Sequence, residues 1–322
     1  MIEILACGPL ATVQDGGRPG HLARGLAPGG AADRRALAEA AALVGPGAVI
    51  ETAPAPMTVR LGAAARIAMV GAPALIAADG TPLTAEAAHD LPEGATVTIR
   101  PTGAGAWTYL AVAGGIATPP VMGARATHLI AGIGRPLAAG DRLSLGPAPR
   151  AGPPMRLRDG AADRLGGGTL RLVAGPQTAL FPQAVRDRLE ATAFVRDARG
   201  NRQGVALASE GAGFATADQL ALLSDFVRAG DVQMTGAGEP YVLGPEHQTT
   251  GGYPRIGTVI PADQPRAMQA VPGSPLRLRF VSLAEARAAA WPAPALAPMV
   301  RDPRDIPDLL SYRLADDAWR GE

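Results

Sequence analysis

Short runs of apolar residues recur along the whole chain, separated by turn-forming pairs such as Asp79-Gly80 and Glu93-Gly94. Runs of this length bounded by turn residues predict β-strands. The predicted strands are Met1–Leu5, Met57–Leu61, Arg66–Val70, Ala95–Arg100, Ala106–Ala113, Arg142–Leu145, Leu170–Val173, Gln203–Leu207, Tyr241–Leu243, Gly257–Ile260 and Leu276–Phe280. Such strands are typical of a β-barrel or a sandwich rather than a wound α/β sheet.

Helical periodicity is confined to a few segments. Asp33–Val44 has apolar residues three and four positions apart, and Asp33 stands where an N-cap is expected. Phe181–Glu190 and Leu283–Ala290 are two further predicted helices, and Asp308–Arg320 has the pattern of a short amphipathic helix. The pattern therefore predicts a mainly β protein with a few short helices.

The length of the chain and its punctuation suggest two domains. The 322 residues suit two domains of about 150 residues each. Gly152–Gly168 is rich in Gly, Pro and Arg and lacks a periodic pattern, which is typical of a linker. We expect an N-terminal β domain over residues 1–150, a linker over 151–168, a C-terminal β domain over 169–290 and an extended tail over 291–322.

Composition and charge exclude several classes of function. Charged residues make up 18% of the chain, the formal net charge is +1 and Lys is absent, so no basic stripe predicts nucleic-acid binding. The longest apolar run, Ala104–Pro120, is interrupted by Gly and Thr and falls short of the roughly 20 residues that span a bilayer. We therefore expect a soluble cytoplasmic protein that binds neither nucleic acid nor membranes.

The residue types that usually bind metals or act as nucleophiles are sparse. Cys7 is the only cysteine, which excludes a disulfide within the chain. His21, His89, His128 and His247 have no metal-binding spacing, so we expect no metal site. The absence of Lys excludes a Schiff-base lysine and a phosphate-loop lysine in this chain.

One stretch concentrates neutral hydrogen-bonding groups around two glycines. Gln248-Thr249-Thr250-Gly251-Gly252-Tyr253-Pro254 directly precedes a β-branched run. Glycines permit close approach to the backbone, and Gln and Thr offer donors and acceptors that do not titrate. This combination suits recognition of an amide, a ureido group or a carboxylate. A glycine-rich turn without a ligand collects the same residue types, and the sequence leaves both interpretations open.

A second polar cluster lies near the N-terminus. GPLATVQDGGRPG, residues 8–20, places Gln14, Asp15 and Arg18 around two glycines, and a second glycine pair follows before Asp33. A glycine-rich loop that opens a helix can hold an anion. Asp15 with Arg18 could equally form a surface ion pair, and Asp33 a helix cap. Glu51, at a strand end, is another candidate polar group.

These motifs occur in the order of a known family. GPLATVQDGGRPG, PGGAAD, IET, YLAVAGGIATPPVMGARAT and QTTGGYPRIGTVI resemble the biotin-dependent carboxyltransferase-like family, from roughly residue 5 to residue 288. That family includes the C subunit of 5-oxoprolinase, the second subunit of allophanate hydrolase and antagonists of a sporulation-kinase inhibitor. The resemblance implies two cyclophilin-like β-barrel domains, which agrees with the predicted short strands.

The resemblance also implies an activity and partners. It suggests a subunit that acts with a homologue of the 5-oxoprolinase B subunit, and with a third subunit of an oxoprolinase complex, in ATP-dependent opening of 5-oxoproline to L-glutamate. ATP would be shared with the partner. Since the chain has no Lys, Arg18, Arg125 and Arg202 are the candidates for phosphate contact.

The resemblance assigns roles to individual residues. We expect catalytic roles for Asp15, Arg18 and Arg125. The expected substrate-binding residues are Gln14, Gly30, Asp33, Glu51, Gln248, Thr249, Thr250, Gly251, Gly252 and Tyr253. Together they predict that the early Asp–Arg loop and the Gln248–Tyr253 segment face one cleft.

Some positions depart from the family pattern and leave two alternatives open. Ser224-Asp225-Phe226, Met234–Gly238 and Asn201–Ala206 differ from the motifs expected there. One alternative is a biotin-dependent carboxyltransferase component acting on urea or a similar amide. Its biotin would have to arrive on another chain, because no Lys is present to carry it. The other is a non-catalytic regulator that binds a kinase-inhibitor-like partner.

Overall fold

The N-terminal half of the computed structural model is built from two sheets that face each other across a hydrophobic core. The structure describes residues 1–149, 152–214 and 222–299. One sheet has the order β11(Arg142–Leu143)-β1(Ile2–Ala6)-β4(Met57–Leu61)-β9(Thr96–Pro101)-β6(Ala74–Ala78)-β7(Thr81–Leu83). The other has the order β2(Thr12–Gln14)-β3(Val49–Thr52)-β10(Thr108–Val112)-β5(Ala65–Gly71)-β8(Ala88–Leu91).

Alternation along the strands explains this packing. In β4, Met57, Val59 and Leu61 are buried in the core, whereas Thr58 and Arg60 point outward. In the second sheet, β10 is buried along its whole length because the core covers one face and helix α1 (Arg34–Val44) packs near the other. Strand period therefore sets which residues enter the core.

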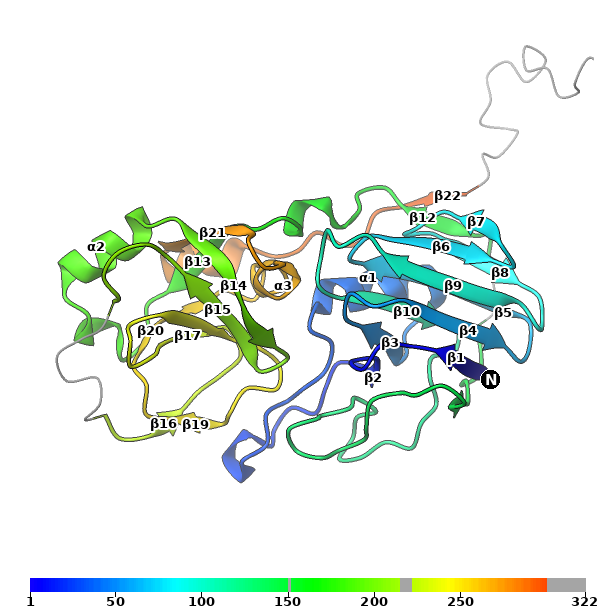
Figure 1. Cartoon of the computed structure of the whole chain (residues 1–322), viewed down its shortest axis with the longest axis horizontal. Coiled ribbons are helices and arrows are strands. Elements are labelled where there is room, and N and C mark those ends of the chain that lie inside the picture. The colour runs from blue at the N-terminus through cyan, green and yellow to red at the C-terminus, as the bar shows by residue number, and fades with distance from the viewer. Residues whose placement is uncertain (150–151, 215–221, 300–322) are drawn as a thin grey trace, which may run out of the picture.

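The C-terminal half is a closed barrel of seven strands. Its order is β13(Gly168–Val173)-β20(Arg255–Val259)-β17(Asp231–Met234)-β18(Pro240–Leu243)-β15(Gly204–Ala208)-β14(Phe194–Asn201)-β21(Pro275–Phe280). All neighbours are antiparallel except β13 and β21, which run parallel and close the ring. Closure leaves no free sheet edge. β16(Asp225–Phe226) and β19(Thr250–Gly251) form a separate two-stranded antiparallel sheet beside the barrel (Figure 1).

The predicted mainly β fold with few short helices is confirmed. Asp33 caps α1, since its Oδ1 accepts from Ala36 N at 2.9 Å. The other helices are α2(Gln183–Ala191), α3(Gln264–Gln269) and α4(Leu283–Ala288), with single 3-10 turns at η1(Leu22–Arg24), η2(Ala161–Arg164) and η3(Thr178–Leu180). α4 begins with a capping box between Ser282 and Glu285. In the described residues the closed barrel is in the C-terminal half, and the N-terminal half forms two sheets.

The segment that the sequence presents as a linker is ordered against both halves. Within 151–168, β12(Met155–Leu157) pairs with β22(Leu296–Pro298) of the tail, and Arg156 bridges to Ala87. η2 places Arg164 in the interior. The pairing of β12 with β22 brings the described part of the tail back to the N-terminal half. The predicted helix Asp308–Arg320 lies outside the described residues.

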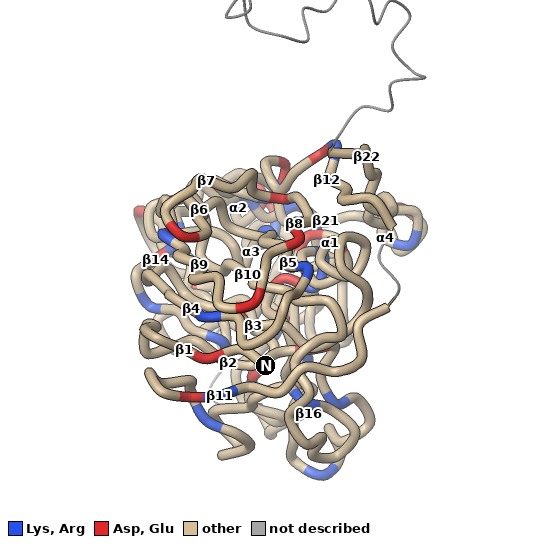
Figure 2. Tube along the Cα trace, turned by 90° about the vertical axis from the view of Figure 1, so that its right-hand side faces the viewer, with Lys and Arg blue, Asp and Glu red and all other residues tan. Residues whose placement is uncertain are grey.

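Positions of acidic and basic residues are interspersed along the trace in Figure 2, without a stripe of one sign. Among the described residues, no helix is both long and apolar enough to cross a membrane.

Candidate functional site

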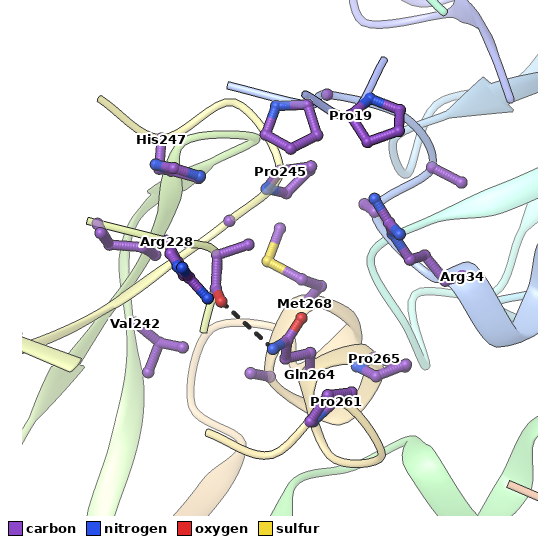
Figure 3. A pocket seen from close by; sticks show the side chains of 18 of the residues that line it. Pro19, Arg34, Arg228, Val242, Pro245, His247, Pro261, Gln264, Pro265 and Met268 are labelled. Carbon is purple, nitrogen blue, oxygen red and sulfur yellow. Dashed lines mark hydrogen bonds between the residues drawn. The ribbon is translucent and has the colours of Figure 1, made fainter. Parts of the chain in front are cut away.

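A cavity lies between the two halves. This central cleft has a volume of about 510 Å³. The N-terminal half contributes residues of the loop that leads into α1, and the C-terminal half contributes residues from β18, α3 and the loops beside them (Figure 3). Its lining residues are Pro19, Gly20, Leu22, Pro28, Gly29, Ala31, Ala32, Arg34, Arg228, Ala229, Val242, Leu243, Gly244, Pro245, His247, Pro261, Gln264, Pro265, Ala267, Met268 and Trp291.

The cleft combines apolar walls with two arginines. Arg34 from α1 and Arg228 from the C-terminal half stand on opposite sides, with Met268 between them (Figure 3). Both arginines are exposed, and none of the described lining residues is Asp or Glu. Gln264 is held in place because its Nε2 donates to Ala229 O and Val259 O. The lining therefore favours an anion with an apolar body.

A glycine pair shapes the N-terminal wall of the cleft. Gly29 and Gly30 both have positive φ, at 63° and 86°. A Cβ on Gly30 would stand 2.7 Å from Gly17 N, so the turn accepts no side chain there. Gly29 N donates to Pro245 O at 3.0 Å, which attaches this loop to the C-terminal half.

Arg202 joins the two halves through buried ion pairs beneath the cleft. Its guanidinium pairs with Glu51 of β3 and with Glu246, and its Nη2 donates to Gly30 O at 2.5 Å. All three charged side chains are buried. Burial alone would lower the pKa of Arg202, but the two carboxylates hold it above its ordinary value. Arg202 is thus fully engaged inside the protein and is not placed to contact a phosphate.

A second buried cluster fixes α1. Arg164 pairs with Asp33 at 2.6 Å and with Glu39 at 2.6 Å, and Gln269 Nε2 donates to Asp33 Oδ2 at 2.9 Å. Burial alone would lower the pKa of Arg164, but Asp33 and Glu39 hold it above its usual range. Asp33 therefore acts as a cap and as an anchor between the halves, and its side chain does not line the cleft.

The three residues predicted to be catalytic do come together. Asp15 Oδ1 accepts from Gly17 N at 2.8 Å, and its Oδ2 accepts from Arg125 N at 2.6 Å. Arg18 and Arg125 line one cavity of about 310 Å³ in the N-terminal half, which we call the loop cavity. Arg18 also lies close to the central cleft. Its Nη1 would be 3.7 Å from a Cβ built on Gly29, which lines that cleft.

The predicted substrate-binding residues divide into two groups. Gln14 and Glu51 are fully buried, and their side chains make internal hydrogen bonds: Gln14 Nε2 donates to Thr12 Oγ1 at 3.0 Å, and Glu51 Oε2 accepts from Ala32 N at 2.7 Å. Gly30 shapes the loop as described. None of these three residues, nor Asp33, lines the central cleft.

The second group, Gln248 to Tyr253, lies beside the cleft rather than in it. Gln248 Nε2 donates to Gln233 Oε1 at 2.8 Å, and Thr250 and Gly251 form β19. Tyr253 is 45% exposed. His247, directly before this segment, does line the cleft, and burial lowers the pKa of its imidazole. The early loop reaches the cleft through Pro19 and Gly20, but no residue from Gln248 to Tyr253 lines it, so the expected convergence on one cleft is not found.

Sequence reasoning missed Arg34 and Arg228. Arg34 directly follows Asp33, and the sequence there predicts only a helix cap. Arg228 follows Ser224-Asp225-Phe226, a stretch that matches no expected motif. Only their positions on facing walls mark them as a pair.

Comparisons with known proteins agree with this architecture. The family model described as "Carboxyltransferase domain, subdomain A and B" matches residues 24–280. The C subunit of the 5-oxoprolinase of Escherichia coli (strain K12) is 34% identical over 293 residues, covering 89% of this chain and 93% of that protein. The corresponding 5-oxoprolinase C subunit of Haemophilus influenzae is 28% identical over 303 residues, with the same coverage.

Solved structures show the same fold. A crystal structure of TTHA0988 superposes with a TM-score of 0.76 at 30% identity, and this chain covers 55% of that chain. The urea amidolyase of K. lactis superposes with a TM-score of 0.79 over 89% of this chain and 19% of that one; at 22% identity this likeness concerns the fold alone. The chain thus spans about half or less of the solved chains that it matches, but nearly the whole of the curated relatives. The chain belongs to the family of carboxyltransferase domains with subdomains A and B.

Proposed function

We propose that this chain is a subunit of an ATP-dependent 5-oxoprolinase, which opens 5-oxoproline to L-glutamate together with a partner of the B-subunit type. The single structural observation behind the proposal is the central cleft, which has apolar walls, two arginines and no Asp or Glu among its described lining residues. The relatives named as C subunits of 5-oxoprolinase support it, because they align over 93% of their length.

The chemistry of the substrate fits this lining. 5-Oxoproline consists of a small lactam ring that carries one carboxylate. Pro261, Pro265 and Met268 offer apolar contact for the ring, and Arg228 or Arg34 would pair with the carboxylate. Because no described acidic side chain lines the cleft, an anion entering it meets no like charge there.

Opening a lactam requires activation, because the amide carbonyl is a poor electrophile. Transfer of the γ-phosphoryl group of ATP to the lactam oxygen releases ADP. Addition of water to the activated carbon, followed by cleavage of the C–N bond, frees the amine and leaves an acyl phosphate. A second water then releases phosphate and glutamate. The role of this chain would be to hold and orient the ring while shielding it from bulk water.

The test is reconstitution with the homologue of the B-subunit type and the third subunit, measuring ATP hydrolysis that depends on 5-oxoproline. Arg228→Met should raise the KM for 5-oxoproline at least about tenfold, since a charge-assisted hydrogen bond is lost. It should have little effect with 2-pyrrolidinone, the same lactam without the carboxylate. Arg279→Met is the control, because Arg279 is an exposed arginine of the same half that does not line the cleft.

Two outcomes would contradict the proposal. Reconstituted protein that hydrolyses no ATP in response to 5-oxoproline would rule out the reaction. If Arg228→Met and Arg34→Met both gave the KM of Arg279→Met, the cleft would be removed as the substrate site. In the same assay, Gln248→Ala tests the segment beside the cleft, because unchanged activity would remove Gln248 from substrate binding.

A second candidate function is favoured by the description of the matching family as a carboxyltransferase domain. In a biotin-dependent carboxyl transfer, biotin would be carried by another chain, since this one has no Lys. A biotin-dependent mechanism predicts that avidin abolishes the activity of the reconstituted complex, whereas a 5-oxoprolinase should be indifferent to avidin.

A further inference from the structure

The loop cavity has an excess of positive charge on its walls. Four arginines and one aspartate are among the residues that line it: Arg18, Arg125, Arg135, Arg142 and Asp141. Arg135 makes a bidentate pair with Asp141, with N–O distances of 2.6 and 2.8 Å, and Arg142 pairs with Glu3 at 3.3 Å. Arg18 and Arg125 have no ion-pair partner among the described residues. Arginines therefore outnumber carboxylates on the walls of this cavity, and the nearest carboxylates, Asp15 and Glu246, act on Arg18 without a direct ion pair.

Arg18 is buried and incompletely hydrogen-bonded. Its side chain is 1% exposed, its Nη2 donates to Ala126 O, and its Nε donates to Val121 O at 3.3 Å. Its Nη1 has no acceptor among the described residues. Burial lowers the pKa of Arg18, and the carboxylates of Asp15 and Glu246 oppose this shift without cancelling it. A buried cationic donor without an acceptor is costly unless a ligand or water supplies one.

A neutral hydroxyl completes the lining. Thr118 lines the same cavity, and its Oγ1 is buried without a hydrogen-bond partner among the described residues. Asp15 couples the loops that carry the two arginines, since its carboxylate holds Gly17 N on one side and Arg125 N on the other. Asp15 thus fixes the backbone at the two loops, and the exposed side chain of Arg125 extends from this fixed backbone.

We propose that Arg18, Thr118 and Arg125 form a binding site for a phosphate group. Phosphate oxygens accept hydrogen bonds from guanidinium groups and hydroxyls, and the excess of arginine over aspartate on the cavity walls favours an anion. The cavity volume of about 310 Å³ admits a phosphoryl group with a small body and excludes enclosure of a whole nucleotide. The assignment of this phosphate to ATP rests on the proposed function. The binding of a phosphate group does not.

The site lies against the central cleft. Arg18 N donates to Pro28 O at 2.8 Å, and Pro19 and Gly29, on either side of this contact, both line the cleft. One loop thus separates the proposed phosphate site from the proposed lactam site. A phosphate held there would place its charge close to the cleft without occupying it.

The experiment titrates this chain alone with inorganic phosphate, and separately with ATP, by isothermal calorimetry at low ionic strength. We expect saturable binding of one phosphate per chain. Arg125→Met should weaken it at least about tenfold and Arg125→Lys less, because Lys keeps the charge but loses the planar fork. Thr118→Val should weaken it by a smaller factor. These variants avoid the buried Arg18, whose replacement could prevent folding.

The control is Arg100→Met, which removes an exposed arginine from β9 of the same half, outside the cavity. Equal phosphate affinity for Arg125→Met and Arg100→Met, or no saturable binding by the wild type, would overturn the site. If Arg125→Met loses affinity for inorganic phosphate and for ATP to the same extent, the phosphoryl group is the common ligand. Binding of phosphate but not of ATP assigns the site to free phosphate or to a small phosphorylated compound. Because no partner and no 5-oxoproline are present, failure here is separate from failure of the proposed reaction.

Discussion

At the scale of single residues, Arg202 joins the two halves through buried ion pairs. It is one arginine with two carboxylate partners, Glu51 from the first half and Glu246 from the second. Its Cζ also lies 5.9 Å from the centre of the Trp107 ring. A buried charge with this many partners is stable only while all of them are present.

Arg202→Met should therefore lower the free energy of unfolding by about 3–5 kcal/mol, because it leaves two carboxylates buried without a cation. Urea denaturation followed by circular dichroism measures the change. Arg199→Met is the matched control: Arg199 lies in the adjoining strand β14 and makes only exposed pairs with Asp197 and Glu239, so we expect little change. Equal effects of the two substitutions would show that the buried network does not stabilise the protein.

At the scale of elements, the loop between β2 and α1 decides whether the cleft exists. It supplies cleft residues from Pro19 to Arg34 and is attached to the C-terminal half through Gly29 and Gly30. The close approach of Gly30 to Gly17 and Asp15 is possible only without a Cβ. The glycine pair noted in the sequence is thus required by packing within the loop.

Gly30→Ala should be far more destabilising than Gly25→Ala. Both residues have positive φ, so both substitutions incur backbone strain of about 1–2 kcal/mol. Only at Gly30 would the new Cβ also collide with backbone atoms, 2.7 Å from Gly17 N and 2.8 Å from Asp15 O, whereas nothing lies within 4 Å at Gly25. Thermal unfolding of the two variants measures the difference. Equal melting temperatures would contradict the role assigned to this close approach.

At the scale of the whole molecule, the two halves share one hydrophobic cluster and a polar junction, which contains the ion pairs of Arg202 with Glu51 and Glu246. The cluster contains Leu43 and Val70 of the first half together with Leu170 and Met268 of the second. His128 and His247 lie at the polar junction. Ala131 N donates to His128 Nδ1 at 3.2 Å, which places the proton of the neutral ring on Nε2.

Acid should weaken this junction. Burial lowers the pKa of His128. Glu246 opposes this shift, and the positive charges of Arg18 and Arg202 add to it. Burial likewise lowers the pKa of His247, opposed by Gln248 O and Asp231. In the unfolded chain both histidines become protonated near pH 6.5, whereas in the folded protein they stay neutral to lower pH. The stability present above about pH 6.5 is therefore lost as the pH falls.

The free energy of unfolding should therefore decrease between about pH 7 and pH 5, by at most about 1.4 kcal/mol per pH unit for each histidine. His128→Gln should give a shallower decrease, whatever its effect on stability at neutral pH. Urea titrations at a series of pH values measure the slope. The same slope for the variant and the wild type would exclude His128 as a source of the acid sensitivity.

The sequence by itself determined the local elements and the family. Short apolar runs bounded by turn residues predicted β4 and β10, the Asp33 cap predicted α1, and ordered glycine motifs pointed to the carboxyltransferase relatives. These features depend on neighbours within a few positions, where side-chain period and capping chemistry act directly. The grouping of Asp15, Arg18 and Arg125 was also anticipated, although the hydrogen bonds that create it became evident only from the structure.

Only the tertiary structure decided which polar residues face a cavity and which are buried as structural pairs. No local pattern in the sequence separates Arg202 from Arg34 and Arg228. Yet Arg202 is paired with Glu51 inside the protein, whereas Arg34 and Arg228 face the cleft. Arg164, within the expected linker, became a buried anchor for the same reason. The physical cause is that burial and charge pairing depend on groups far apart along the chain, which no local pattern specifies.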